Sequence, residues 1–331
     1  DLNISSKNLQ YGEDRYRSVF WDQILADVIF NCQDIPPIDY SRRNPTKADG
    51  CDMIILSPDK AEFLQWADTI RRFRNEQGML TKIVTTGEIG GNDSEIIKSF
   101  FNEVYQSWDP VPSSILLLGD FGIQNDGVLS QTFFDHPENV TYVSDNYFAD
   151  ATNNDLPDFV IGRISAQTEE HLNSIISRYI SYEQNPPIKA SYYQNPLTVC
   201  GYQGDRWFQM CIESISGYMK NALGKNPKRI DELVHWYGPD DPFTDPWSTA
   251  PNSDLPINYF GSNGLSYLPS SPADVGPWGG GNADSIINGI NAGSFITLLR
   301  DHGSSDYYAV PEFHIQDVDG LQNIDFPTHV F

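Results

Sequence analysis

The 331-residue chain is short of positive charge and of long hydrophobic runs. It carries 21 lysines and arginines against 45 aspartates and glutamates, which gives a formal net charge of −24. Nucleic-acid-binding proteins need a basic patch for the phosphate backbone, so this balance argues against a nucleic-acid partner. No apolar run approaches the roughly 20 residues that cross a bilayer, so the sequence predicts no transmembrane segment. The acidity fits a secreted or surface protein, or one that holds divalent cations.

Cysteine is also scarce, with four residues at Cys32, Cys51, Cys200 and Cys211. No pair shows C-x-x-C spacing and no histidine pair lies nearby, so the sequence predicts no zinc site. A chain of this length holds full cores without cross-links, so we predict no disulfide framework.

The first 50 residues lack a sustained period, apart from one amphipathic helix expected between Tyr16 and Phe30. Pro36, Pro37 and the polar residues 41–50 then interrupt it, as linkers do. We interpret residues 1–50 as a leader or the tail of a preceding domain. No signal peptide opens the chain, so we expect a mature or excised product.

From Asp52 onward, buried strands alternate with amphipathic helices. Strands are expected at 53–56, 81–85, 114–120 and 159–163, and helices at about 60–76, 94–108 and 168–183. Such alternation predicts a parallel sheet with right-handed crossovers.

A polar, proline-marked stretch from Pro186 to Pro196 interrupts this pattern and marks the boundary between two domains. The pattern restarts with a strand at 197–200 and a helix at about 206–223. Residues 239–281 are long and aperiodic, as functional loops usually are. We therefore predict two α/β subdomains, residues 51–190 and 191–331, with mainly parallel sheets.

An acidic loop lies between Val143 and Arg163, with carboxylates at Asp145, Asp150, Asp155 and Asp158. Calcium prefers several such oxygen ligands, but the spacing is not that of an EF-hand. Aspartate is also an ordinary turn residue. Residue chemistry alone therefore favours a solvated turn over a calcium site.

One histidine stands at the end of an apolar run. Residues Phe295–Leu299 predict a strand buried on both faces of a parallel sheet, and Asp301, His302 and Gly303 end it. Open α/β sheets place ligands at the carboxyl ends of their strands. His302 therefore suits proton transfer, and the Gly303 N–H beside it suits oxyanion binding. On position alone, a loop histidine that merely ends a strand remains the alternative.

Several stretches together resemble the gingipain family of cysteine peptidases, a caspase-like group secreted by Bacteroidetes-type bacteria. The matching stretches are 115–120, 144–150, 156–165, 178–183 and Asp301–Ser304, and the linker 38–42 resembles the end of a propeptide. Their order and spacing span roughly residues 50–331.

The resemblance implies a caspase-like three-layer α/β/α fold in two subdomains, with His302 as the catalytic histidine. It places the nucleophilic cysteine just past Phe331, on a strand that Phe326–Phe331 begins. No cysteine of this chain takes that place, so we expect the chain alone to be inactive and the missing C-terminal portion to be its partner. Asp205 is a candidate to orient His302, but a helix N-cap role suits it equally well.

The resemblance also bears on substrate, metal and location. Arginine-directed members bind their substrate's cation with a carboxylate early in the helix that here begins Arg206-Trp207-Phe208-Gln209, which has none. Trp207 and Phe208 are therefore candidates to line an apolar site for a protein or peptide substrate, although aromatic residues on a helix more often belong to the core. The family binds calcium in this part of the fold, which favours structural calcium on Asp145 and Asp150. Secretion, or attachment to the bacterial outer membrane, is implied.

Three functions remain open on the sequence. The first is a secreted cysteine endopeptidase. The second is a sortase-like peptidase that trims the C-terminal signals of type IX secretion cargo. The third is a non-catalytic binding protein on the peptidase fold. A strand that stops just after it begins argues against the third, because a functional protein still needs its core strand.

Overall fold

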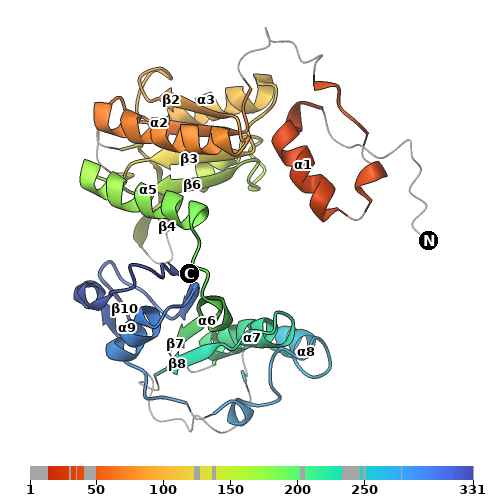
Figure 1. Cartoon of the computed structure of the whole chain (residues 1–331), viewed down its shortest axis with the longest axis vertical. Helices are drawn as coiled ribbons and strands as arrows, with labels where there is room; N and C mark the ends of the chain where they lie inside the picture. Colours follow the sequence, from red (N-terminus) through yellow and green to blue (C-terminus); the bar gives the residue numbers. More distant parts are fainter. Residues whose placement is uncertain are drawn as a thin grey trace. The chain divides into compact units, whose positions relative to one another are not determined.

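The computed structural model describes residues 14–29, 31–34, 36–40, 50–122, 127–135, 139–201, 206–232, 247–248, 251–276 and 278–330. The chain divides into two compact units, Asp1–Gln184 and Asn185–Phe331 (Figure 1). In the described residues, no helix is both long enough and apolar enough to cross a membrane.

The first unit is built on a four-stranded parallel sheet. Its strand order is β2 (Thr81–Thr85), β1 (Met53–Ser57), β3 (Ser114–Leu118) and β6 (Val160–Ile164). Helices α2 (Ala61–Glu76) and α5 (Glu169–Gln184) pack on one face, and α3 (Ser94–Ser107) packs on the other. Buried side chains alternate along β1 between these two layers, as the period of a strand requires. The result is a three-layer α/β/α arrangement.

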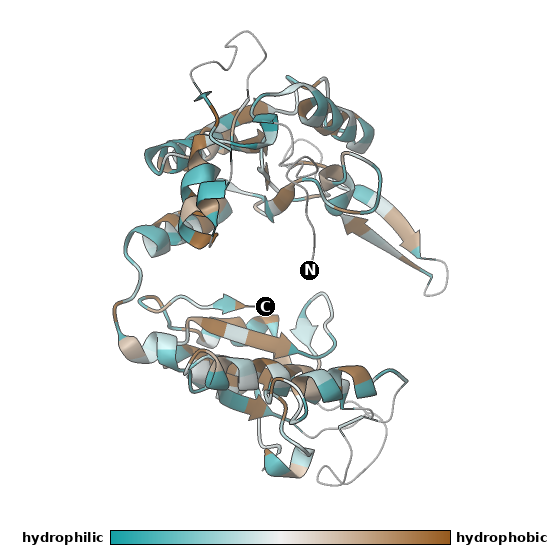
Figure 2. Cartoon of the chain, turned by 90° about the vertical axis from the view of Figure 1, so that its right-hand side faces the viewer, coloured by the Kyte–Doolittle hydropathy of each residue, from teal (hydrophilic) through white to brown (hydrophobic). Residues whose placement is uncertain are grey.

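An antiparallel hairpin, β4 (Gln131–Asp135) and β5 (Val140–Ser144), leads into the short helix α4 (Asn146–Ala149). Figure 2 shows hydrophobic stretches along this hairpin, and Phe134 and Tyr142 are about half exposed. No strand was expected in this stretch from the sequence. The remaining elements of the first unit are α1 (Val19–Val28), η1 (Asp14–Tyr16) and η2 (Cys32–Asp34).

The second unit repeats the architecture. Its parallel sheet has the order β12 (His329–Val330), β9 (Ile296–Arg300), β7 (Leu197–Cys200) and β8 (Lys228–Asp231). Helix α7 (Trp207–Asn221) and helix α9 (Ala283–Asn291) belong to opposite layers of this sheet. The smaller elements are α6 (Ala190–Gln194), α8 (Asp254–Phe260), η4 (Pro272–Asp274), β10 (Tyr307–Tyr308), β11 (Phe313–His314) and η5 (Ile315–Gly320).

The α/β fold class with mainly parallel sheets is confirmed. The strands expected at 81–85 and 197–200 have those bounds, and the strand expected to begin at Phe326 is formed at His329–Val330. The predicted strand 114–120 is too long, because Gly119 adopts a φ of 115° just after Leu118. That left-handed backbone ends the strand.

Candidate active site

His302 lies two residues beyond the carboxyl end of β9, and it is exposed. β9 is an inner strand, with β12 on one side and β7 on the other. The His302 C=O accepts a hydrogen bond from the Ala309 N–H at 2.9 Å, which ties the histidine to the segment that returns past β10. The histidine therefore stands where parallel sheets present their functional groups.

Gly303 presents its backbone N–H at the same edge. It forms a single antiparallel bridge with Tyr308, and the hydrogen bonds around that bridge belong to its neighbours, Ser304 to Tyr307 and Ala309 to His302. In such a pairing, the N–H and C=O of the bridged residue point away from the partner strand. A Cβ at Gly303 would lie 3.8 Å from the Tyr308 ring, an ordinary contact. The position therefore does not require glycine, and the Gly303 N–H points away from the Tyr308 segment.

Phe208 packs directly against the histidine. The two ring centroids are 5.1 Å apart with an interplanar angle of 70°, an edge-to-face contact. The Arg300 guanidinium lies over the Phe208 ring, 4.1 Å from its centroid. Phe208 is only 4% exposed, so its ring is itself held by its surroundings. A fixed aromatic ring of this kind gives the His302 ring a surface that holds it in place. Its role in binding substrate stays a prediction.

Trp207 points to a different place from its neighbour. It lines an apolar cavity of about 400 Å³ along one side of α7, together with Met210, Ile215, Tyr218 and Phe260. Successive residues of a helix point about 100° apart, so Trp207 and Phe208 serve separate surroundings. The structure thus does not bring these two predicted substrate residues together in one pocket.

Asp301 is a residue of this site that the sequence analysis did not single out. Its Oδ1 accepts the His302 backbone N–H, and its Oδ2 is buried, with no hydrogen-bond partner among the described residues. The carboxylate fills the space over Gly201, where a Cβ would lie 1.6 Å from Oδ2. Burial raises the pKa of Asp301. The aspartate therefore links the loop that carries His302 to the end of β7.

Asp205 lies outside the described residues, so its predicted role in orienting His302 stays a prediction. The N-cap position of α7 is occupied by Arg206, in the left-handed conformation at φ 54°.

The carboxylates predicted to bind calcium have protein partners. Arg163 donates from Nε to Asp145 Oδ2 at 2.8 Å and from Nη2 to Oδ1 at 2.7 Å. Burial opposes ionisation of Asp145, but these bonds outweigh it and lower its pKa. Asp150 accepts the backbone N–H groups of Asn154 and Asp155, both at 3.0 Å. Among the described residues, no group of three or more acidic, histidine or cysteine side chains is placed to hold a metal ion.

The family model of Peptidase family C25 matches residues 46–331. The chain belongs to this family. No curated protein sequence matches it.

Two solved structures similar to this chain are gingipain structures. The complex of Porphyromonas gingivalis RgpB pro- and mature domains superposes with a TM-score of 0.56 at 19% identity, over 82% of this chain and 52% of that one. The Arg-specific cysteine proteinase gingipain R gives 0.56 at 18% identity, over 84% of this chain and 52% of that one. At such identities the likeness supports the shared fold. The chain spans about half the length of these structures.

A cysteine peptidase needs a cysteine whose thiol can become a nucleophilic thiolate. All four cysteines of the chain are free. Burial raises the pKa of Cys51 to about 12 and also raises that of Cys200, whose Sγ donates to Asp231 Oδ1 at 3.2 Å. A buried thiol that stays protonated is not a nucleophile. Cys32 and Cys211 lie on a 3-10 helix and on α7, and neither follows a strand of the sheet.

Proposed function

We propose that this chain is the histidine-bearing part of a cysteine endopeptidase. His302 acts as general base, and the nucleophilic cysteine is carried by polypeptide beyond residue 331. The peptidase family match supports the reaction class, and the position of His302 at the carboxyl edge of β9 supports its role. Neither the type IX signal peptidase nor the binding-protein alternative is favoured by these findings.

The register of β12 against β9 indicates where the proposed nucleophile would lie. β12 runs parallel to β9 on the side away from β7, with His329 opposite Ile296 and Val330 opposite Thr297. If the strand continued in this register, it would reach the level of Arg300 after three more residues and the level of His302 after five. A cysteine at that point would stand beside the imidazole, because the carboxyl ends of parallel strands meet at one edge.

In the proposed reaction His302 takes the thiol proton, and the thiolate attacks the scissile carbonyl to give a tetrahedral oxyanion. The outward N–H of Gly303 is placed to donate to that oxyanion. The imidazolium then gives its proton to the leaving amine, which leaves an acyl-enzyme for water to hydrolyse. Asp301 and Phe208 hold the histidine loop and ring in place for both transfers.

We further propose that the enzyme prefers an apolar side chain near the cleaved bond. The first turn of α7 carries no carboxylate, unlike that of the arginine-directed gingipains that the sequence resembles. Phe208 of that turn instead packs its apolar ring against His302. The test compares kcat/KM for matched peptides that carry Phe, Leu, Arg or Lys before the cleaved bond. A higher kcat/KM for the Arg and Lys peptides than for the Phe and Leu peptides would contradict this preference.

A secreted or surface location is part of the proposal, as is a protein or peptide substrate. The location is supported by the family and by the net charge of −24, and the substrate by the family. By analogy with the RgpB complex, the proposal includes a pro-domain as a second partner.

The nucleophile is tested by covalent labelling. The complete protein is treated with a peptidyl acyloxymethyl ketone, which alkylates an activated thiolate, and the modified peptide is identified by mass spectrometry. The label is expected on one cysteine beyond residue 331. Labelling of Cys32, Cys51, Cys200 or Cys211 in its place would refute the assignment.

A further inference from the structure

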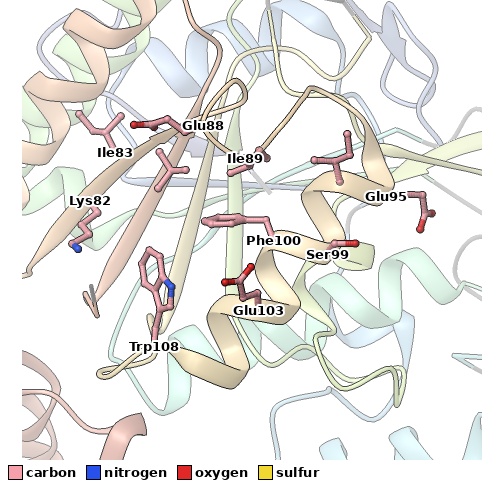
Figure 3. A pocket seen from close by; sticks show the side chains of 11 residues that line it. Lys82, Ile83, Glu88, Ile89, Glu95, Ser99, Phe100, Glu103 and Trp108 are labelled. Atoms are coloured by element: carbon pink, nitrogen blue, oxygen red, sulfur yellow. The ribbon is translucent and has the colours of Figure 1, made fainter. Parts of the chain in front are cut away.

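In the first unit, a groove of about 720 Å³ runs between β2 and α3 (Figure 3). β2 is the edge strand of its sheet within the described part of the chain. Figure 3 shows Phe100 of α3 and Trp108 lying near this strand. The floor is apolar and partly buried, formed by Val84, Ile89, Ile96, Phe100 and Trp108.

The backbone of β2 alternates between the sheet and the outside. Leu80 N–H donates to Asp52 Oδ2 at 2.8 Å, and the Leu80 C=O accepts from the backbone of Asp52 at 2.7 Å. Thr86 N–H donates to the Ser57 C=O at 2.9 Å. Even-numbered residues therefore direct their N–H and C=O toward β1, and odd-numbered residues direct theirs to the outer edge.

Side chains close both ends of this outer edge. Thr81 N–H donates to Asn75 Oδ1 at 2.8 Å, and Thr85 N–H donates to Glu88 Oε2 at 2.7 Å. Between them, the N–H and C=O of Ile83 point outward with no partner in the described residues. One residue of the edge is thus left able to exchange two backbone hydrogen bonds with another strand.

The rim of the groove is acidic. Glu88, Glu95 and Glu103 are exposed around it, against one lysine, Lys82. A second copy of this chain would bring the same three carboxylates to the interface, which opposes self-pairing of two β2 edges. A basic segment is attracted instead, at a site whose floor also accepts apolar side chains.

We propose that β2 and the groove beside it bind an extended segment of a partner protein whose side chains on the groove face are both apolar and basic. The segment adds a strand to the sheet through the N–H and C=O of Ile83. On that face, its apolar side chains enter the groove and its basic side chains meet the glutamates of the rim. The site is independent of the proposed catalytic chemistry.

The test uses the 331-residue chain and a fluorescein-labelled, end-blocked heptapeptide, Lys-Thr-Val-Thr-Val-Thr-Lys, whose lysines and valines share one face of a strand. Fluorescence anisotropy is the readout. Ile83→Pro removes the outward N–H but no bond to β1, and proline is tolerated in edge strands. We expect saturable binding that Ile83→Pro weakens at least tenfold. Glu103→Lys should weaken it several-fold, whereas Glu76→Lys, on α2 outside the groove, should not.

A second probe keeps the test valid if Ile83→Pro fails to fold. The same peptide, N-methylated at all its inner amides, has no inner N–H on either edge to pair with a strand and should lose at least tenfold in affinity for the wild-type chain. Failure of the parent peptide to bind would overturn the proposal. So would equal binding of the methylated peptide, or equal binding by a folded Ile83→Pro variant.

Discussion

The Asp301 carboxylate packs directly against Gly201, and this contact positions the loop that carries His302. A methyl group on Gly201 would lie 1.6 Å from Asp301 Oδ2 and 2.7 Å from the Val310 C=O. The Val310 contact is to backbone, which a side-chain rotation does not relieve. Neither residue stands out locally in the sequence, because their contact depends on the pairing of β7 with β9.

We expect Gly201→Ala to destabilise the protein by about 1–3 kcal/mol, the usual range for overpacking. Gly162→Ala is the matched control, because a methyl group there meets nothing within 4 Å and should change stability by at most about 0.5 kcal/mol. Urea unfolding measures both. Equal midpoints for the two variants would show that the Gly201 contact is not close.

Asp301→Ala tests the link between this pair and the proposed chemistry. The alanine cannot accept the His302 backbone N–H, whereas asparagine at 301 can, so in the complete enzyme we expect kcat to fall more for alanine than for asparagine. KM should change little, because Asp301 is proposed to position the histidine rather than to bind substrate. Equal kcat values for the two variants would argue against this positioning role.

Asp231 is a buried carboxylate beside the Cys200 thiol. Burial raises its pKa from 3.8 to about 7, although Arg229 opposes this. A folded-state pKa above the unfolded value gives stability that is present below about pH 4 and lost as the pH rises through about 7. Wild type should therefore lose more unfolding free energy between pH 5 and 8 than Asp231→Asn.

Chemical denaturation at several pH values measures this difference. Asp254→Asn is the control, since Asp254 is exposed on α8 and should leave the wild-type slope unchanged. A slope for Asp231→Asn as steep as that of wild type would contradict the assignment of the proton to Asp231.

At the scale of elements, the sequence predicted the strands and helices whose buried residues recur in a regular pattern. The run Leu197–Cys200 is buried at every position, and α3 carries an N-cap at Asp93, whose side chain accepts from Glu95 N–H. Such signals are local and therefore readable. The hairpin β4–β5 was missed because most of its residues are exposed or half-exposed, so no apolar face marks it. Its aromatic and β-branched residues were the available signal.

The acidic loop at 145–158 tests the calcium prediction. Both oxygens of Asp145 are bound by Arg163, so a cation there would rest mainly on Asp150 and backbone carbonyls. If calcium binds only the folded state, EGTA should lower the melting temperature, and Asp150→Asn should reduce that shift. An unchanged melting temperature with EGTA would favour the solvated turn.

At the scale of the whole molecule, two α/β units of the peptidase family C25 fold follow each other in one chain. The strand–helix alternation predicted both sheets, and a single strand end pointed to His302. Trp207 and Phe208 were predicted to line one site, but their neighbouring positions on α7 place them in different surroundings. The contacts of His302 with its neighbours depend on how the strands pair, and no local sequence pattern predicts that pairing.

The most direct test of the proposed function is the turnover of the complete protein carrying His302→Ala on a fluorogenic peptide. Loss of the general base should lower kcat by about 10²–10⁴-fold, with an unchanged melting temperature, because the exposed side chain leaves no cavity. His171→Ala, on the exposed side of α5, should retain full turnover. A folded His302→Ala enzyme with near-wild-type kcat would contradict the proposed role of this histidine.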